Sequence, residues 1–410
     1  MKEIRKLYAD RIGGKSFGEG TTLFKFEKIK RAKRQAIIQH KEMALIDLGV
    51  GEPDGMADEG ILDELNKQAR RWENRGYADN GIMEFQQAAE YMQHVYGVHE
   101  LIPEKEILHV IGTKSAYTLI PQAFINPGDI MLMTVPGYPV MGTISKWLGG
   151  KVYELPLEEK YGFLPRLDCI PSEVAKKAKL LYLNYPNNPT GAVATIKFYK
   201  EVIEFAKEHQ IIVVQDAAYG ALTFGSTRPL SFLSVPGAKE VGIEVHSLSK
   251  AFNMTGWRLG FLAGNPEVIK AIGAVKENND CGQFKAIQLA GAYALKHPEI
   301  TECLCEKYER RHLKLAKVLE EVGFESRIPS ASFYEYIKIP SGCKNGKRFQ
   351  SAEEFSEFLI QKAMISTVPW DEAGHYIRLS VTFVAPTLEE EDTVIAEIKQ
   401  RLLDCQLLFE

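Results

Sequence analysis

The chain has 410 residues, of which 45% are hydrophobic and 25% are charged, a length and composition suited to about two or three domains with buried cores. It carries 50 Lys and Arg residues against 54 Asp and Glu residues, a net charge of -4. This balance argues against nucleic acid or an anionic membrane surface as the main partner.

The chain start and the cysteines indicate where the protein is found. The first ten residues lack the apolar core of a signal peptide, and no run of about 18 apolar residues predicts a membrane-spanning helix. The 6 cysteines include no C-x-x-C pair. Together these features predict a cytoplasmic protein with reduced thiols.

Residues 1–50 are expected to form an N-terminal arm and part of a small domain. Their basic run at 25–41 has the composition of a helix. A nucleic-acid-binding patch is the alternative interpretation of this run, but a solvated helix face is the more common outcome.

Residues 51–295 are expected to form a large domain, because short apolar runs alternate there with longer segments of helical period. Runs such as 211–215 do not alternate in polarity, so both faces of the sheet should be covered. Helices are expected at 114–124, 138–148 and 196–209. The expected strands are 106–111, 129–135, 151–155, 179–184, 211–215, 241–247 and 259–263. The pattern predicts an α/β fold with a mostly parallel seven-stranded sheet.

Residues 296–410 have a different pattern of apolar and charged residues, which predicts a smaller α+β domain. A long charged helix at 298–322 leads into an alternating strand at 333–339, on which Phe333, Glu335, Ile337 and Ile339 share one face. A helix at 352–364, a strand at 376–381 and a final amphipathic helix at 388–403 complete the prediction.

Several familiar motifs fail on inspection. A dinucleotide-binding G-x-G-x-x-G that begins at Gly49 would need its third glycine at position 54, which is Asp54. A P-loop that ends at Ser16 would need its first glycine at position 9, which is Ala9. The sequence contains no H-E-x-x-H motif, so it gives no local indication of a zinc site. The segment 247–250 fits the S-x-x-K of serine acyl-enzymes, but no K-T-G accompanies it. That class remains an alternative.

Chemically useful residues follow the carboxyl ends of the expected strands, where open α/β folds bind ligands. Thr113 and Lys114 open a helix and suit a phosphate, and Arg258 could grip that phosphate bidentately. Tyr138 offers an aromatic face. Asp216 ends an apolar strand, where a carboxylate needs a cationic partner. Lys250 could condense with an aldehyde if its pKa, near 10.4 in model peptides, were lowered.

This combination is the protein side of pyridoxal phosphate chemistry. The motifs YPNNPTG, DAAY and SLSKAFNMTGWRLG occur in one order at 185–191, 216–219 and 247–260. With them the chain resembles the fold type I pyridoxal phosphate aminotransferases, the group that includes aspartate and alanine aminotransferases, over nearly its whole length.

The resemblance implies a role for each matching residue. Lys250 looks like the lysine that binds the cofactor covalently and moves the substrate proton, and Asp216 like the carboxylate beside the ring nitrogen. Asn188 and Tyr219 match donors to the ring hydroxyl, and Tyr138 matches the stacking ring. The phosphate-binding positions correspond to Thr113, Lys114, Ser247 and Arg258.

The resemblance also implies how the substrate is held. Arg378 is similar to the arginine that clamps the α-carboxylate, and Gly51 matches a glycine on the substrate side. Tyr77 resembles a tyrosine that reaches the phosphate of the neighbouring subunit, which implies a homodimer with shared active sites. Amino acids and 2-oxo acids are the expected substrates.

Four further segments, at 137–150, 155–171, 231–250 and 277–291, look most like the LL-diaminopimelate aminotransferases. These transfer an amino group between LL-diaminopimelate and 2-oxoglutarate in lysine and peptidoglycan synthesis. Lys114, Asn279 and Asp280 could meet the polar groups of such a substrate.

Two segments depart from that subgroup: Thr21–Phe24 lacks its tyrosine, and Gly49–Asp54 is closer to the general aspartate and alanine enzymes. The open alternatives are therefore a general aspartate, alanine or aromatic aminotransferase and, more remotely, a β-lyase with the same cofactor.

Overall fold

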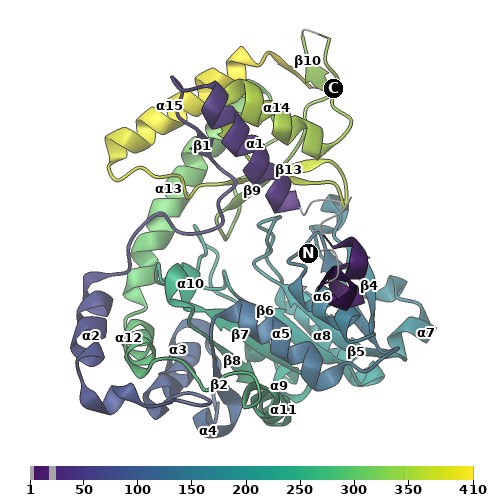
Figure 1. Ribbon diagram of the computed structural model, residues 1–410, viewed down its shortest axis with the longest axis vertical. Coiled ribbons are helices and arrows are strands. Elements are labelled where there is room, and N and C mark those ends of the chain that lie inside the picture. Colours follow the sequence, from purple (N-terminus) through teal and green to yellow (C-terminus); the bar gives the residue numbers. More distant parts are fainter. Residues whose placement is uncertain (1–3, 18–24, 345, 410) are drawn as a thin grey trace.

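The computed structural model describes residues 4–17, 25–344 and 346–409, so the expectation for Thr21–Phe24 lies outside the described residues. Figure 1 shows a large sheet in the lower half of the molecule and a smaller group of helices and strands above it. No helix within the described ranges has the length and apolar character needed to cross a membrane.

The central sheet has seven strands in the order β2-β8-β7-β6-β5-β3-β4. β8 runs antiparallel to both its neighbours, and the other neighbouring strands are parallel. The expected mostly parallel seven-stranded sheet is confirmed. The strands are β2 (Ile107–Val110), β3 (Ile130–Val135), β4 (Lys151–Pro156), β5 (Ala178–Asn184), β6 (Ile212–Asp216), β7 (Gly242–Ser247) and β8 (Gly260–Gly264).

Both faces of this sheet are buried, as the apolar runs predict. Successive residues of β6 enter different cores: Val213 packs with Phe198 and Val202 of α8, and Val214 packs with Ile120 of α5. The helices around the sheet are α2 (Glu59–Ala69), α3 (Gln87–Tyr96), α4 (Pro103–Glu106), α5 (Thr113–Phe124), α6 (Val140–Trp147), α7 (Ser172–Ala175), α8 (Ile196–His209), α9 (Ala238–Val241), α10 (Leu248–Ala251), α11 (Pro266–Lys276) and α12 (Lys285–Lys296).

The upper group contains a three-stranded antiparallel sheet in the order β12-β13-β9. Phe333 and Ile337 are buried in its core, whereas the carboxylate of Glu335 on the same face is paired with His312 at 3.2 Å. The elements are α13 (Glu299–Val322), β9 (Tyr334–Lys338), β10 (Gly342–Cys343), α14 (Ala352–Ala363), β11 (Ile365–Ser366), β12 (Val368–Trp370), β13 (Tyr376–Ser380), α15 (Leu388–Asp404) and β14 (Leu407–Leu408).

The early chain packs on this upper group. β1 (Ile46–Asp47) pairs in parallel with β11, and Ala36 of α1 (Lys25–Gln39) packs against Ile360 and Met364. In Figure 1, α13 reaches from the neighbourhood of α12 up to α15 and so links the two groups. The proposed division at residues 50 and 295 stays a prediction.

Candidate active site

Asp216 ends β6 with its carboxylate buried among hydrogen-bond donors. Tyr182 Oη donates to Asp216 Oδ2 at 2.7 Å, and the Ala218 backbone N–H donates to Oδ1 at 3.0 Å. Burial raises the pKa of Asp216 despite these bonds. A cationic partner beside it would stabilise the charged carboxylate, which is what a protonated ring nitrogen supplies.

Lys250 lies on α10, and its Nζ donates to the backbone oxygen of Gly51 at 2.7 Å. Burial, together with the nearby charges of Arg258 and Arg378, lowers the pKa of Lys250 to about 8, although Glu52 opposes the shift. At neutral pH about a tenth of this lysine is then the neutral nucleophile, against about one part in 3,000 for an unperturbed lysine.

The residues expected to bind phosphate meet where α5 begins, a place called here the phosphate cradle. Gly112 precedes this helix with φ 72°, and a Cβ there would collide with the Arg258 guanidinium. The Ser115 N–H donates to Gly112 O at 3.1 Å, and the N–H groups before it, which have no partner within the helix, lie beside a cation. Arg258 Nη1 donates to Thr255 O at 2.7 Å, which fixes its guanidinium.

Ser247 and Lys114 complete the residues expected around the phosphate. Ser247 precedes Lys250 by one turn, and its Oγ accepts from Ser249 N at 3.1 Å to cap α10. Lys114 is exposed on the first turn of α5. The predicted phosphate site therefore consists of a helix N-terminus, a hydroxyl and a guanidinium.

Tyr138 lies half-buried over the same region. Its ring is 6.0 Å from that of Tyr117, which in turn lies 5.9 Å from the Tyr182 ring. Burial and the neighbouring Asp216 charge raise the pKa of Tyr138, and the Arg258 charge opposes the shift. Tyr138 therefore lies within electrostatic reach of both Asp216 and the phosphate cradle, as a stacking ring would.

Arg378 is buried on β13, and two of its three guanidinium nitrogens donate hydrogen bonds. Its Nη1 donates to Asn188 Oδ1 at 2.7 Å and its Nη2 to Gly49 O at 2.9 Å. Its Nε is buried without a hydrogen-bond partner in the part of the chain that the structure describes. A buried unpaired donor is costly, and a substrate carboxylate would satisfy it.

Tyr219 and Tyr334 form a buried pair whose hydroxyl oxygens are 2.6 Å apart. Burial raises the pKa of Tyr219 far above its ordinary value, so the phenol stays protonated as a donor. The Arg378 guanidinium lies 4.1 Å from the centre of the Tyr334 ring. A Cβ on Gly51 would come 2.6 Å from the Tyr334 hydroxyl, so only glycine fits there.

Tyr77, Asn279 and Asp280 lie together in a second region. The Ala78 N–H donates to Cys281 O at 3.4 Å, which joins the two loops. Tyr77 is 81% exposed, Asn279 donates to Val275 O, and Asp280 accepts from Lys276. Among the residues that the structure describes, no hydrogen bond connects these three side chains to Lys250 or Arg378.

Sequence reasoning missed Tyr334 and the partnership of Tyr182 with Asp216. The alternation of 333–339 places Tyr334 on the face opposite Phe333, which was a usable signal once the strand was assigned. Tyr182 stands two residues before Asn184, which pairs in register with Asp216. To infer this contact, one must know that the two strands are neighbours in the sheet, and the sequence does not give the strand order.

The donor set fits pyridoxal phosphate. The carboxylate of Asp216, the amine of Lys250, the cradle at Gly112 and Arg258, and the unpaired Nε of Arg378 match the ring nitrogen, the aldehyde, the phosphate and a substrate carboxylate in chemical kind. The roles given to individual residues remain predictions.

Curated relatives cover nearly the whole chain. The LL-diaminopimelate aminotransferase of Methanocaldococcus jannaschii is 58% identical, and that of Methanococcus maripaludis is 54% identical, each over 99% of both chains. At this coverage the similarity includes both the sheet and the upper group.

Solved structures agree on the fold. A substrate-bound structure of BacF from Bacillus subtilis has a TM-score of 0.87 at 31% identity and covers 98% of both chains. A probable N-succinyldiaminopimelate aminotransferase of Thermus thermophilus has a TM-score of 0.81 at 29% identity, over 92% of this chain and all of the other.

The family model for aminotransferase class I and II matches residues 44–398, which include every element of the candidate site. A serine acyl-enzyme is therefore the wrong interpretation of 247–250, where Ser247 caps a helix. The chain belongs to the class I and II aminotransferase family and is a pyridoxal phosphate-dependent aminotransferase of fold type I.

Proposed function

We propose that this enzyme transfers an amino group between LL-diaminopimelate and 2-oxoglutarate. The observation that carries the proposal is the 58% and 54% identity, over nearly full length, to two enzymes with the name LL-diaminopimelate aminotransferase. The product of the reaction closes to tetrahydrodipicolinate, so we assign the enzyme to lysine and peptidoglycan synthesis. We propose the cytoplasm as its location.

The bound pyridoxal phosphate supplies an electron sink for the bond at the substrate α-carbon. Lys250 Nζ would hold the cofactor and would move the proton to and from the substrate α-carbon. Asp216 would keep the ring nitrogen protonated, and Arg378 would orient the α-carboxylate through its Nε, which has no hydrogen-bond partner among the described residues. Asn188 and Tyr219 donate toward the ring hydroxyl.

The distal end of the substrate needs polar partners, which we assign to Lys114, Asn279 and Asp280. Lys114 and Asn279 are exposed and Asp280 is half-buried, so these side chains have contact area left to offer a ligand. We assign Tyr77 to the phosphate of the neighbouring subunit, so that the working enzyme is a homodimer with shared sites.

Exposed apolar side chains support this dimer. Trp72, Tyr77 and Met83 are 71%, 81% and 77% exposed, and Met83 lines a surface hollow of about 720 Å³ together with Asn80 and His109. Exposed large apolar side chains beside a hollow are typical of a protein interface.

A general amino-acid aminotransferase is the second candidate, because Gly49–Asp54 is similar to that of the aspartate and alanine enzymes. Formation of glutamate from 2-oxoglutarate, with LL-diaminopimelate and then with aspartate, alanine or phenylalanine as donor, decides between the two. Our proposal requires the highest kcat/KM with LL-diaminopimelate. Pyruvate released from cystathionine without any oxo acid would instead identify a β-lyase.

A further inference from the structure

Residues 49–54, called here the glycine strip, accept hydrogen bonds from two cations of the candidate site, Arg378 and Lys250. Three successive backbone oxygens accept hydrogen bonds: Gly49 O from Arg378 Nη2 at 2.9 Å, Val50 O from Thr382 Oγ1 at 3.2 Å, and Gly51 O from Lys250 Nζ at 2.7 Å. The position of the glycine strip therefore affects the substrate-binding arginine and the catalytic lysine together.

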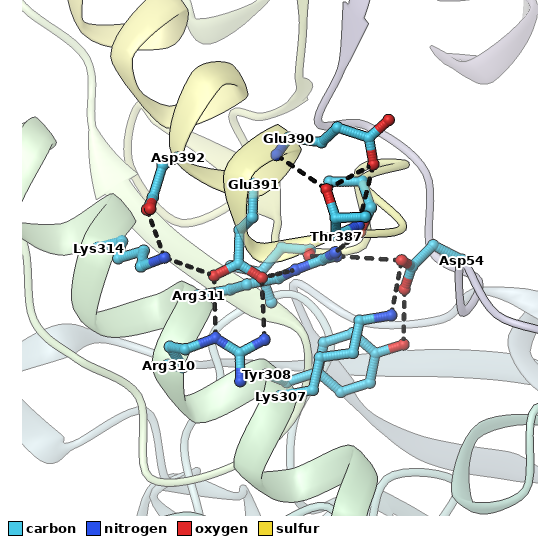
Figure 2. Close-up of polar contacts among 12 residues, drawn as sticks. Asp54, Lys307, Tyr308, Arg310, Arg311, Lys314, Thr387, Glu390, Glu391 and Asp392 are labelled. Atoms are coloured by element: carbon cyan, nitrogen blue, oxygen red, sulfur yellow. Dashed lines mark hydrogen bonds and ion pairs between the residues drawn. The ribbon is translucent and has the colours of Figure 1, made fainter.

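The far end of the glycine strip is anchored by Asp54. Its side chain is only 4% exposed, and its carboxylate accepts from Lys307 Nζ at 2.7 Å, Tyr308 Oη at 3.1 Å and Arg311 Nη1 at 3.2 Å. Figure 2 shows that all three donors belong to one helix, α13, and point toward the carboxylate of Asp54. A buried carboxylate is stable only with such partners, so this contact holds the strip firmly to α13.

Arg311 connects this anchor to the chain that follows β13. Its side chain is fully buried, and its guanidinium donates to the backbone oxygens of Val381 at 2.9 Å, Phe383 at 2.8 Å and Ala385 at 3.0 Å. These residues come directly after the strand that carries Arg378. One guanidinium thus holds the glycine strip and the segment beyond the substrate arginine in a single arrangement.

Glu391 holds the Nε side of the Arg311 guanidinium: Arg311 Nε donates to Glu391 Oε2 at 3.0 Å. Although burial opposes it, hydrogen bonds from Arg310, Lys314 and Arg311 lower the pKa of Glu391 to about 2. The capping box of Thr387 and Glu390 starts α15 and places Glu391 in its first turn (Figure 2). The guanidinium is therefore oriented from both sides.

We propose that Asp54 and Arg311 are positioning residues for substrate binding, which hold the glycine strip so that Arg378 and Lys250 keep their places around the α-carboxylate and the α-amino group. The proposal rests on the aminotransferase function described above. Among the described residues, neither side chain forms a hydrogen bond or ion pair with Lys250 or Asp216, so we expect their loss to weaken substrate binding more than cofactor binding.

The test is Asp54→Asn, which keeps the shape of the side chain and removes its charge. The holoenzyme is assayed with the amino acid that wild type converts best. We expect the KM of that amino acid to rise about tenfold or more, because an arginine clamp that moves by a fraction of an ångström loses its alignment. The dissociation constant of pyridoxal phosphate should change much less than this KM.

Asp392→Asn is the matched control. Asp392 lies in the same charged cluster, but its side chain is 67% exposed and pairs with Lys314, away from Asp54. Its loss should leave KM unchanged, because exposed ion pairs contribute little. An equal rise in KM for both variants would contradict the proposal.

A second variant, Lys307→Met, keeps the test decisive if Asp54→Asn does not fold. The Lys307 side chain is 26% exposed, and methionine retains most of its stem, so we expect this variant to fold with a smaller rise in KM. A lowered melting temperature with wild-type KM in both variants would show a purely structural role and overturn the proposal. Failure of wild type to use LL-diaminopimelate would count against the proposed substrate alone, because KM is measured with the best amino acid.

Discussion

At the scale of single residues, the proposed chemistry depends on two cations held by backbone oxygens. Lys250 and Arg378 donate to Gly51 and Gly49, two residues apart, so one short segment contacts both the proposed nucleophile and the proposed carboxylate clamp. Each cation keeps capacity for its ligand: the amine of Lys250 is partly neutral, and the Nε of Arg378 has no hydrogen-bond partner among the described residues. Burial lowers the pKa of the amine and keeps the Nε away from solvent.

The lowered pKa of Lys250 predicts how cofactor uptake depends on pH. Only the neutral amine attacks an aldehyde, and its fraction increases through a pKa of about 8. Covalent attachment of pyridoxal phosphate to the apo-protein should therefore accelerate with rising pH and level off above that value. Stopped-flow absorbance of the bound cofactor measures the rate, with Lys250→Ala as the unreactive control. An acceleration that continues to the ordinary lysine pKa would refute the shift.

Arg378→Lys tests the carboxylate clamp. Lysine keeps the charge but cannot present a planar pair of donors, so we expect the KM of both the amino acid and the oxo acid to rise about a hundredfold. Cofactor affinity should not change. Lys338→Met is the control, because Lys338 belongs to the neighbouring strand and its side chain is 57% exposed. An unchanged KM in Arg378→Lys would remove Arg378 from the site.

At the scale of elements, helices reach the site in two ways: α5 and α10 through their N-terminal ends, and α13 through side chains near its middle. α5 presents its first turn to the phosphate cradle, α10 is capped by Ser247, and α13 presents Lys307 and Arg311 to the glycine strip. The strands contribute residues at their carboxyl ends, such as Asp216 at the end of β6. Small shifts of an element therefore change the site before they disturb the core.

A helix remote from the chemistry should affect stability alone. Thr195 caps α8, and its Oγ1 accepts from Phe198 N at 3.1 Å. Thr195→Ala should lower the free energy of unfolding by about 1 kcal/mol without changing kcat/KM. Urea denaturation measures this loss, and Thr195→Ser, which keeps the hydroxyl, should behave as wild type. A loss of kcat/KM in the alanine variant would show that α8 is coupled to the site.

At the scale of the whole molecule, local patterns predict elements, but contacts between distant residues escape them. The seven strands are predictable because their apolar runs and turns are local. Asp54 and Arg311 are 257 positions apart, and Tyr219 and Tyr334 are 115 apart. Only the folded chain brings such pairs together. Motif similarity supplied Asp216, Lys250 and Arg258, but it carried no information on their partners Tyr182, Gly51 and Thr255.

A shared dimeric site predicts complementation between inactive chains. Lys250→Ala and Tyr77→Ala should each lower activity strongly, since both residues serve every site of a homodimer. Hybrid dimers refolded from the two variants contain one site with both residues intact, so activity should return above the sum of the separate variants. Mixtures of each variant with itself are the control. No recovery, with hybrids demonstrated by mass, would contradict the assignment of Tyr77 to the neighbouring subunit.

The most direct test of the proposed function is a half-reaction without any oxo acid. The holoenzyme is mixed separately with LL-diaminopimelate, glutamate, aspartate, alanine and phenylalanine, and the absorbance of the bound cofactor is followed from its pyridoxal to its pyridoxamine form. We predict fast conversion with LL-diaminopimelate and glutamate and slow conversion with the other three. Fast conversion with aspartate, alanine or phenylalanine but not with LL-diaminopimelate would contradict the proposal and identify a general aminotransferase.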